Sequence, residues 1–238
     1  VGAGIVEARL RLRSTSTTGD PVPILVYGLK RDWQESEVTW ERADATSPWA
    51  LAGADSPQSD RDRAASASAV VSGGQIWYEW DVTELVNAWV KGEQSNHGLL
   101  LLASESSGGT YTFASSESAN APQLTFHYAL ATLTPTYTPT ATATRTPTPG
   151  PTNTPSPTMA PTPTLVPGGV IFTATADTYI SDWFPADNYC RDPKLTVRKG
   201  DIVSSLIYFD LSSIPLGTTI NGAWLNLYCT NRTNIGEM

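Results

Sequence analysis

The sequence predicts an all-β protein, an antiparallel β-sandwich or jelly roll with one short helix and a long extended linker. Short runs rich in Val, Leu, Ile, Tyr, Phe and Trp alternate with clusters of Gly, Ser, Asn and Pro, which is typical of strands joined by turns. Between two such regions, residues 132–167 contain 14 Thr and 10 Pro in 36 positions, and their only charge is Arg145. This segment has too little apolar surface to form a core, so we expect a polyproline-like spacer.

The region before the linker is expected to hold strands at residues 4–13, 23–29, 75–82, 97–104, 109–116 and 122–129. A helix is expected over residues 81–92, because Asp81 and Glu84 have the spacing of a capping box and Gly92 is well placed as a stop. Its apolar side chains recur at helical spacing, so we assign them to the core: Val82, Leu85, Val86, Trp89 and Val90.

After the linker, strands are expected at residues 170–175, 178–181, 195–198, 204–210 and 219–229. The last of these resembles the start of the chain at an offset of 215 positions, since Ala8, Leu10 and Leu12 fall on Ala223, Leu225 and Leu227. Residues two apart share one face of a strand, so one face of this strand is kept while the other differs. The pattern indicates a tandem repeat of about 215 residues.

Composition argues against several classes of partner. The net charge is −8 and only 16% of the residues are charged, whereas nucleic acids and anionic membranes attract clustered Lys and Arg. No apolar run reaches the roughly 20 residues of a membrane span. The sequence has no GxSxG, HExxH or phosphate-loop motif, so we expect no enzymatic activity and no catalytic residues.

The segment around residues 31–49 combines tryptophans with carboxylates and is a candidate glycan-binding site, formed by Trp33, Trp40 and Trp49. Indole faces can stack on sugar rings, and carboxylates can accept hydrogen bonds from hydroxyl groups. The alternative is that these indoles close the open end of the sandwich. His97 and His127 are interpreted as ordinary surface or edge residues.

Four aspartates after the linker are candidate ligands for Ca²⁺, which prefers oxygen donors: Asp177, Asp182, Asp187 and Asp201. The alternative is that they are solvated loop residues. The two cysteines, Cys190 and Cys229, are expected to form a disulfide, with two buried thiols as the alternative.

Thr and Ser beside Pro are typical of O-glycosylated extracellular stalks. The candidate O-glycosylation sites in the linker are Thr134, Thr136, Thr138, Thr140, Thr146, Thr148, Thr154 and Thr162. Asn231 begins the one Asn-x-Thr sequon with a permitted middle residue, and it is a candidate for N-glycosylation. The linker therefore indicates an extracellular or cell-surface location.

Several stretches together resemble the DNRLRE-domain family: "WQESEVTW", "DVTELVNAWVKG", "YTFASSESANAPQLTFHY", "ADTYIS" and "SSLIYFDLSSIPLGTTINGAWLNLY". Their order is permuted, because motifs that come first in the family follow the linker here. The resemblance implies that residues 1–128 are the C-terminal part of one β-sandwich, 129–168 the linker, and 169–238 the N-terminal part of a second sandwich. It also implies similarity to jelly-roll carbohydrate-binding modules.

Our main functional hypothesis from the sequence is a non-enzymatic extracellular structural repeat that forms a head-to-tail array or filament. Residues 169–238 are too few to bury their apolar faces alone, so a neighbouring copy is expected to complete their sandwich. The alternative is a carbohydrate-binding module of a secreted or cell-surface protein, with a polysaccharide as partner.

Overall fold

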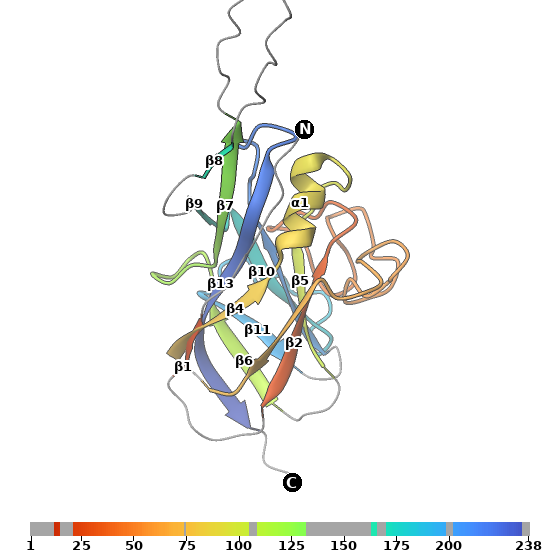
Figure 1. Ribbon diagram of the computed structural model, residues 1–238. Helices are drawn as coiled ribbons and strands as arrows, with labels where there is room; N and C mark the ends of the chain where they lie inside the picture. The colour runs from red at the N-terminus through yellow and green to blue at the C-terminus, as the bar shows by residue number, and fades with distance from the viewer. Residues whose placement is uncertain are drawn as a thin grey trace, which may run out of the picture.

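The computed structural model describes residues 12–14, 21–73, 75–104, 109–131, 163–165, 170–198 and 202–234 (Figure 1). Before the linker, the elements are β1 (Leu12–Ser14), β2 (Val22–Gly28), β3 (Ala67–Val71), β4 (Gln75–Asp81), α1 (Thr83–Lys91), β5 (Leu99–Ala103), β6 (Gly109–Ala114) and β7 (Gln123–Ala131). The later elements are β8 (Pro163–Leu165), β9 (Val170–Thr173), β10 (Ala176–Ser181), β11 (Lys194–Arg198), β12 (Val203–Tyr208) and β13 (Thr219–Asn234).

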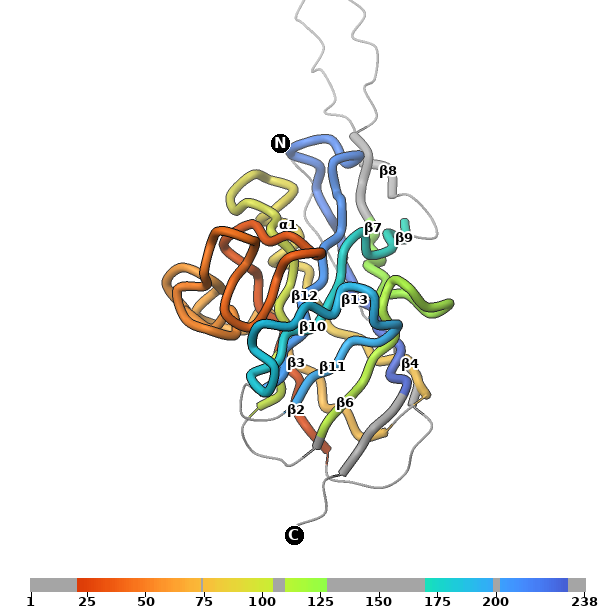
Figure 2. The backbone as a smooth tube through the Cα atoms, turned by 180° about the vertical axis from the view of Figure 1, so that it is seen from behind, coloured from red at the N-terminus to blue at the C-terminus, as the bar shows by residue number. Residues whose placement is uncertain are grey.

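The strands form two antiparallel layers, as the sequence predicts. One layer has the order β1-β4-β13-β7, and β7 also pairs with β8 and β9. The other has the order β10-β12-β5-β2-β3. Strands β6 and β11 pair with each other and connect the layers, since β6 pairs with the end of β13 and β11 with β12 (Figure 2). The result is a β-sandwich with a single short helix.

Strand β13 is shared by both layers. Residues 219–226 pair with β7, residues 224–228 pair with β4 on the other side, and from Cys229 onward the strand pairs with β6. The alternating residues Ala223, Leu225 and Leu227 are fully buried in the core between the layers. The inward face that the repeat preserves is therefore the face that packs, as period-2 alternation predicts.

The segments before and after the linker complete one sandwich within a single chain. Strand β12 pairs with β5, β11 with β6, and β13 with β4, β6 and β7. The expectation that a neighbouring copy must cover residues 169–238 is therefore corrected, because residues before the linker bury Leu206 and Leu225 completely.

The two copies of the repeated strand do not occupy the same place. Strand β13 takes the position between β4 and β7, whereas β1 pairs with the other side of β4, where Leu12 lies opposite Trp77. Residues 1–11, which hold the rest of the first copy, lie outside the described residues.

Helix α1 begins at Thr83, two residues after the start of the predicted segment, and Gly92 ends it as predicted. The predicted capping box of Asp81 and Glu84 is not formed, because the N-cap residue makes no side-chain capping hydrogen bond. Val82 is its N-cap, and the carboxylate of Asp81 accepts hydrogen bonds from the Thr83 amide at 3.0 Å and the Thr83 hydroxyl at 2.6 Å. Gly92 follows the last turn at φ 73°, a left-handed conformation that favours glycine. The apolar stripe of the helix is buried, so its assignment to the core is confirmed.

Two strands were not anticipated. Strand β3 consists of small residues without a clear alternation, and β8 comes from the end of the predicted spacer, where Pro163, Thr164 and Leu165 pair with β7. The eight candidate threonines of the linker lie outside the described residues. Asn231 lies in β13 with its backbone in register with Thr112, and its side chain is not described.

The two cysteines are not joined in a disulfide, which corrects that expectation. Cys229 is fully buried in the sandwich core on β13, whereas Cys190 is half-buried in the loop between β10 and β11. The two cysteines are close in sequence, but they do not face each other in the fold.

The central place of β13 predicts that substitutions at equivalent positions of the repeated strand lower the free energy of unfolding by different amounts. Leu227→Ala should lower the free energy of unfolding by about 2–5 kcal/mol, because it opens a cavity in the core. Leu12→Ala should cost less, since β1 lies at the edge of its layer. Urea unfolding of both variants checks this, and a larger loss for Leu12→Ala would contradict the observed strand order.

Candidate functional site

A long irregular segment, residues 30–66, covers the outer face of the β10-β12-β5-β2 layer (Figure 2). It explains the continuous apolar run of β5. Leu99 and Leu101 face the core between the layers, while Leu100 and Leu102 face a second apolar cluster beneath this segment. A strand buried on both faces is expected to be apolar throughout.

The three candidate tryptophans of this segment have different environments. Trp40 and Trp49 belong to the second apolar cluster and are only 8% and 5% exposed. The Trp49 indole N–H also donates to the carbonyl oxygen of Thr39 at 3.0 Å. These two indoles offer no face to a ligand, so their prediction as glycan contacts is corrected, and they cover a sheet face rather than an open end.

Trp33 lies at the wall of a cavity of about 180 Å³, together with Asp32, Gln34, His97, Ala176 and Tyr208. Its indole N–H donates to the carbonyl oxygen of His97 at 3.0 Å. The His97 Nδ1 atom lies 2.7 Å from a carboxylate oxygen of Asp32. Segments far apart in sequence are thereby fixed to each other around one opening.

Gly98 makes this arrangement possible. A Cβ atom at this position would lie 2.5 Å from the carbonyl oxygen of Ile207, and the residue has φ 91°. The backbone after His97 therefore approaches β12 more closely than a side chain would allow. Asn96 supports the same turn. Its side-chain oxygen accepts a hydrogen bond from the Gly98 amide, and its side-chain nitrogen donates one to the carbonyl oxygen of Phe209.

A second cavity of about 490 Å³ shares one lining residue, Tyr208, with the first. Its other walls come from α1, from the turn before β5 and from the loop after β12, and include Trp89, Asn96, Asp210, Ser212 and Leu216. We call the two cavities together the Tyr208 groove. An aromatic residue shared by both cavities, together with carboxylate, amide and hydroxyl groups in their linings, suits a ligand rich in hydroxyl groups.

Charge in the Tyr208 groove comes from carboxylates. Burial raises the pKa of the Tyr208 hydroxyl, and the negative charges of Asp210 and Asp32 raise it further. The phenol therefore stays protonated, so it can both donate and accept a hydrogen bond. The described residues that line the groove include no Lys or Arg.

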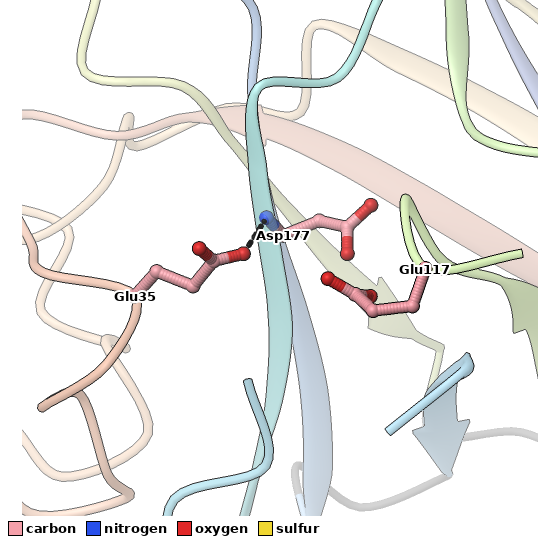
Figure 3. Close-up of side chains that lie close together, drawn as sticks. All are labelled: Glu35, Glu117 and Asp177. Carbon is pink, nitrogen blue, oxygen red and sulfur yellow. Dashed lines mark hydrogen bonds between the residues drawn. The ribbon is translucent and has the colours of Figure 1, made fainter. Parts of the chain in front are cut away.

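Three carboxylates gather beside the Tyr208 groove: Glu35 from the long segment, Glu117 from the turn after β6, and Asp177 from β10 (Figure 3). One oxygen of each lies within 4.8 Å of the others. Glu35 accepts a hydrogen bond from the Asp177 amide at 2.8 Å, and Asp177 accepts from the amide and hydroxyl of Ser116 at 2.8 and 3.2 Å. We call this group the carboxylate trio.

The environment of the carboxylate trio disfavours negative charge. Asp177 is 1% exposed, and burial raises the pKa of its carboxyl group from 3.8 to about 7, with further contributions from the charges of Glu117 and Glu35. Burial also raises the pKa of Glu35. A bound proton or a divalent cation would reduce the cost of burying these negative charges close together. Carboxylate oxygens are ligands that Ca²⁺ prefers.

Of the four predicted calcium ligands, only Asp177 belongs to the carboxylate trio. Asp182 and Asp187 lie in the loop at the other end of β10, where their amides donate to the carbonyl oxygens of Ile202 and Phe184. Asp201 lies outside the described residues. The partners of Asp177 come from before the linker, so clustering of aspartates along the sequence could not reveal them.

The raised pKa of Asp177 predicts a specific pH dependence in calcium-free buffer. The folded state holds the Asp177 proton more tightly than the unfolded state does. The contribution of this proton to the free energy of unfolding is therefore complete below about pH 4 and is lost as the pH rises to about 7. The contribution is on the order of 4 kcal/mol, at 1.36 kcal/mol for each pKa unit.

Asp177→Asn should remove this slope, while Asp182→Asn, at the other end of β10, should keep it. Urea unfolding between pH 4 and 7.5 measures the difference. Equal slopes for the wild type and Asp177→Asn would contradict the assignment.

Comparison with known proteins gives a family for the chain. The family model of carbohydrate-binding module family 96 matches residues 1–128, which are more than half of the sequence. No curated protein and no solved structure matches the chain. The described residues contain no helix with the length and apolar character of a membrane span. The resemblance to DNRLRE domains stays a prediction, whereas its carbohydrate-binding component is supported: the chain belongs to carbohydrate-binding module family 96.

Proposed function

We propose that the chain is a non-catalytic module of an extracellular or cell-surface protein and that it binds a polysaccharide in the Tyr208 groove. The observation that carries this proposal is the position of Tyr208, which lines both cavities in a member of a carbohydrate-binding family. Hydroxyl-rich ligands need both an aromatic surface and fixed hydrogen-bonding groups, and the groove provides both.

The array or filament that we expected from the sequence receives no support. Its main argument was that residues after the linker lack the strands that cover them, and those strands are supplied by the same chain. The repeated strand is accommodated without a second copy in the place of β13. The alternative from the sequence, a carbohydrate-binding module, is therefore the function that we propose.

Trp33 retains a role in this proposal, in contrast to Trp40 and Trp49. Its ring lines the smaller cavity and its indole N–H positions the backbone of His97. Asp32 and Gln34 on either side of it supply polar groups to the same cavity. The linker threonines and Asn231 remain candidate glycosylation sites, which fit an extracellular location.

The first experiment measures binding to polysaccharides. Affinity electrophoresis through gels containing cellulose ether, mannan, xylan, pectin or alginate should show retardation by at least one of them. Tyr208→Ala should weaken the affinity for that polysaccharide at least about tenfold, because it removes the aromatic side chain of the residue that lines both cavities.

Tyr228→Ala is the matched control, since Tyr228 packs edge-to-face on Trp77 away from the groove. Unchanged affinity of a folded Tyr208→Ala variant would contradict the proposed site. Absence of retardation in every gel would contradict the proposed function.

The carboxylate trio is proposed to hold Ca²⁺ next to the groove, since Glu35 and Asp177 directly follow two of its lining residues, Gln34 and Ala176. Ca²⁺ at a hundred times its Kd should stabilise the fold by about 2.7 kcal/mol and raise Tm by several degrees at pH 7.5.

EDTA should reverse the increase, and Glu117→Gln should reduce it. Glu41→Gln should leave it intact, because Glu41 is an exposed carboxylate outside the trio. A wild-type Tm that does not respond to Ca²⁺ would remove calcium from the proposal.

A further inference from the structure

The loop that follows β10 exposes two adjacent aromatic side chains, Trp183 and Phe184. Their exposed fractions are 52% and 58%. Most other tryptophans of the described residues have exposed fractions below 9%: Trp40, Trp49, Trp80, Trp89 and Trp224. Exposure of two neighbouring rings is unfavourable in water, so it indicates a contact surface rather than a packing role.

The backbone that carries these rings is held in place on several sides. The Asp182 amide donates to the carbonyl oxygen of Ile202 at 2.8 Å, and the Phe184 amide donates to that of Ser181. Farther along the loop, the Asn188 side chain donates to two carbonyl oxygens of the long segment, each at 2.7 Å. The rings are therefore presented by a braced loop.

The Trp183 indole is also oriented by a cation. The guanidinium carbon of Arg198 lies 4.3 Å from the centre of its ring, and Arg198 donates to the hydroxyl of Thr110 at 3.3 Å. An indole held in one orientation loses little conformational entropy when a ligand stacks on it. Such preorganisation is what a stacking surface for a rigid ring requires.

We propose that Trp183 and Phe184 form a second sugar-contact surface, the β10-loop platform, which takes the same polysaccharide chain that occupies the Tyr208 groove. This inference rests on the proposed function and specifies its ligand as an extended polymer. The aromatic faces stack on the C–H faces of sugar rings. The carboxylates of Asp182 and Asp187 in the same loop can accept hydrogen bonds from sugar hydroxyl groups.

The distance between the two surfaces sets the length of the ligand. Ala176 at the start of β10 lines the groove, and Trp183 follows the end of β10 at Ser181. The six residues of β10 span about 20 Å at 3.3 Å per residue. A disaccharide is too short to contact both, whereas a chain of several sugar units reaches from one to the other.

The size of the platform favours a glycan over a second copy of this chain. Two aromatic side chains that are about half exposed offer roughly 100 Å² each. A stable protein dimer buries about 800 Å² on each partner, which is several times more. A stacked sugar ring, by contrast, needs only the face of one aromatic ring.

The test uses the full chain, the polysaccharide that retards the wild type, and its oligomers from two to six sugar units, with affinities measured by isothermal titration calorimetry. Trp183→Ala/Phe184→Ala should weaken binding of the hexamer and the polymer at least tenfold, because a second linked contact adds avidity. Binding of the disaccharide should be unchanged. Tyr208→Ala should weaken both, and Trp183→Phe should retain most of the affinity for the polymer.

Val70→Ala is the matched control, since Val70 is 57% exposed on the edge strand β3, away from both surfaces. Circular dichroism melting verifies that each variant is folded. Equal affinity of the wild type and the double variant for the hexamer would overturn the platform while leaving the groove intact. Loss of a wild-type dimer in the double variant, seen by sedimentation, would overturn it in favour of self-association.

Discussion

The fold depends on one constraint, the insertion of β13 between β4 and β7. This strand comes from beyond the linker, yet it pairs on both sides with strands that precede the linker, and its end continues along β6. Its inward side chains, among them Leu225 and Leu227, fill the centre of the core. Without β13, the layer would divide into separate pieces with unpaired edges, which is why the two segments fold as one unit.

The Tyr208 groove also depends on the pairing of strands from both sides of the linker. Trp33 and His97 come from before the linker, while Tyr208 comes from after it, and β12 brings them together by pairing with β5. The carboxylate trio is likewise assembled from both sides, since Glu35 binds the amide of Asp177. The linker therefore separates in sequence what the sandwich joins in space, and the candidate site exists only where the two segments meet.

The sequence was sufficient for the helix and for most of the strands, because alternation, apolar runs and glycine positions are local properties, whereas β3 and β8 were not predicted. It identified the preserved inward face of β13 from Ala223, Leu225 and Leu227. It could not show which copy of the repeated strand occupies the core, since both satisfy the same pattern. It also could not show that Trp40 is buried while Trp33 is only partly buried. That difference arises from how the segment 30–66 packs on the outer face of β5 and β12. Glu117 carries no local signal, since only tertiary pairing brings it to Asp177.

One chain completes its own sandwich, and isotope-filtered NMR tests this most directly. An equal mixture of ¹⁵N-labelled and ¹³C-labelled chains is unfolded, refolded together and examined for nuclear Overhauser effects between Leu124 on β7 and Leu225 on β13, which are paired in register. We predict that these effects occur only within chains of one label. Effects of comparable intensity between differently labelled chains would contradict the account, because β13 would then be supplied by a neighbour.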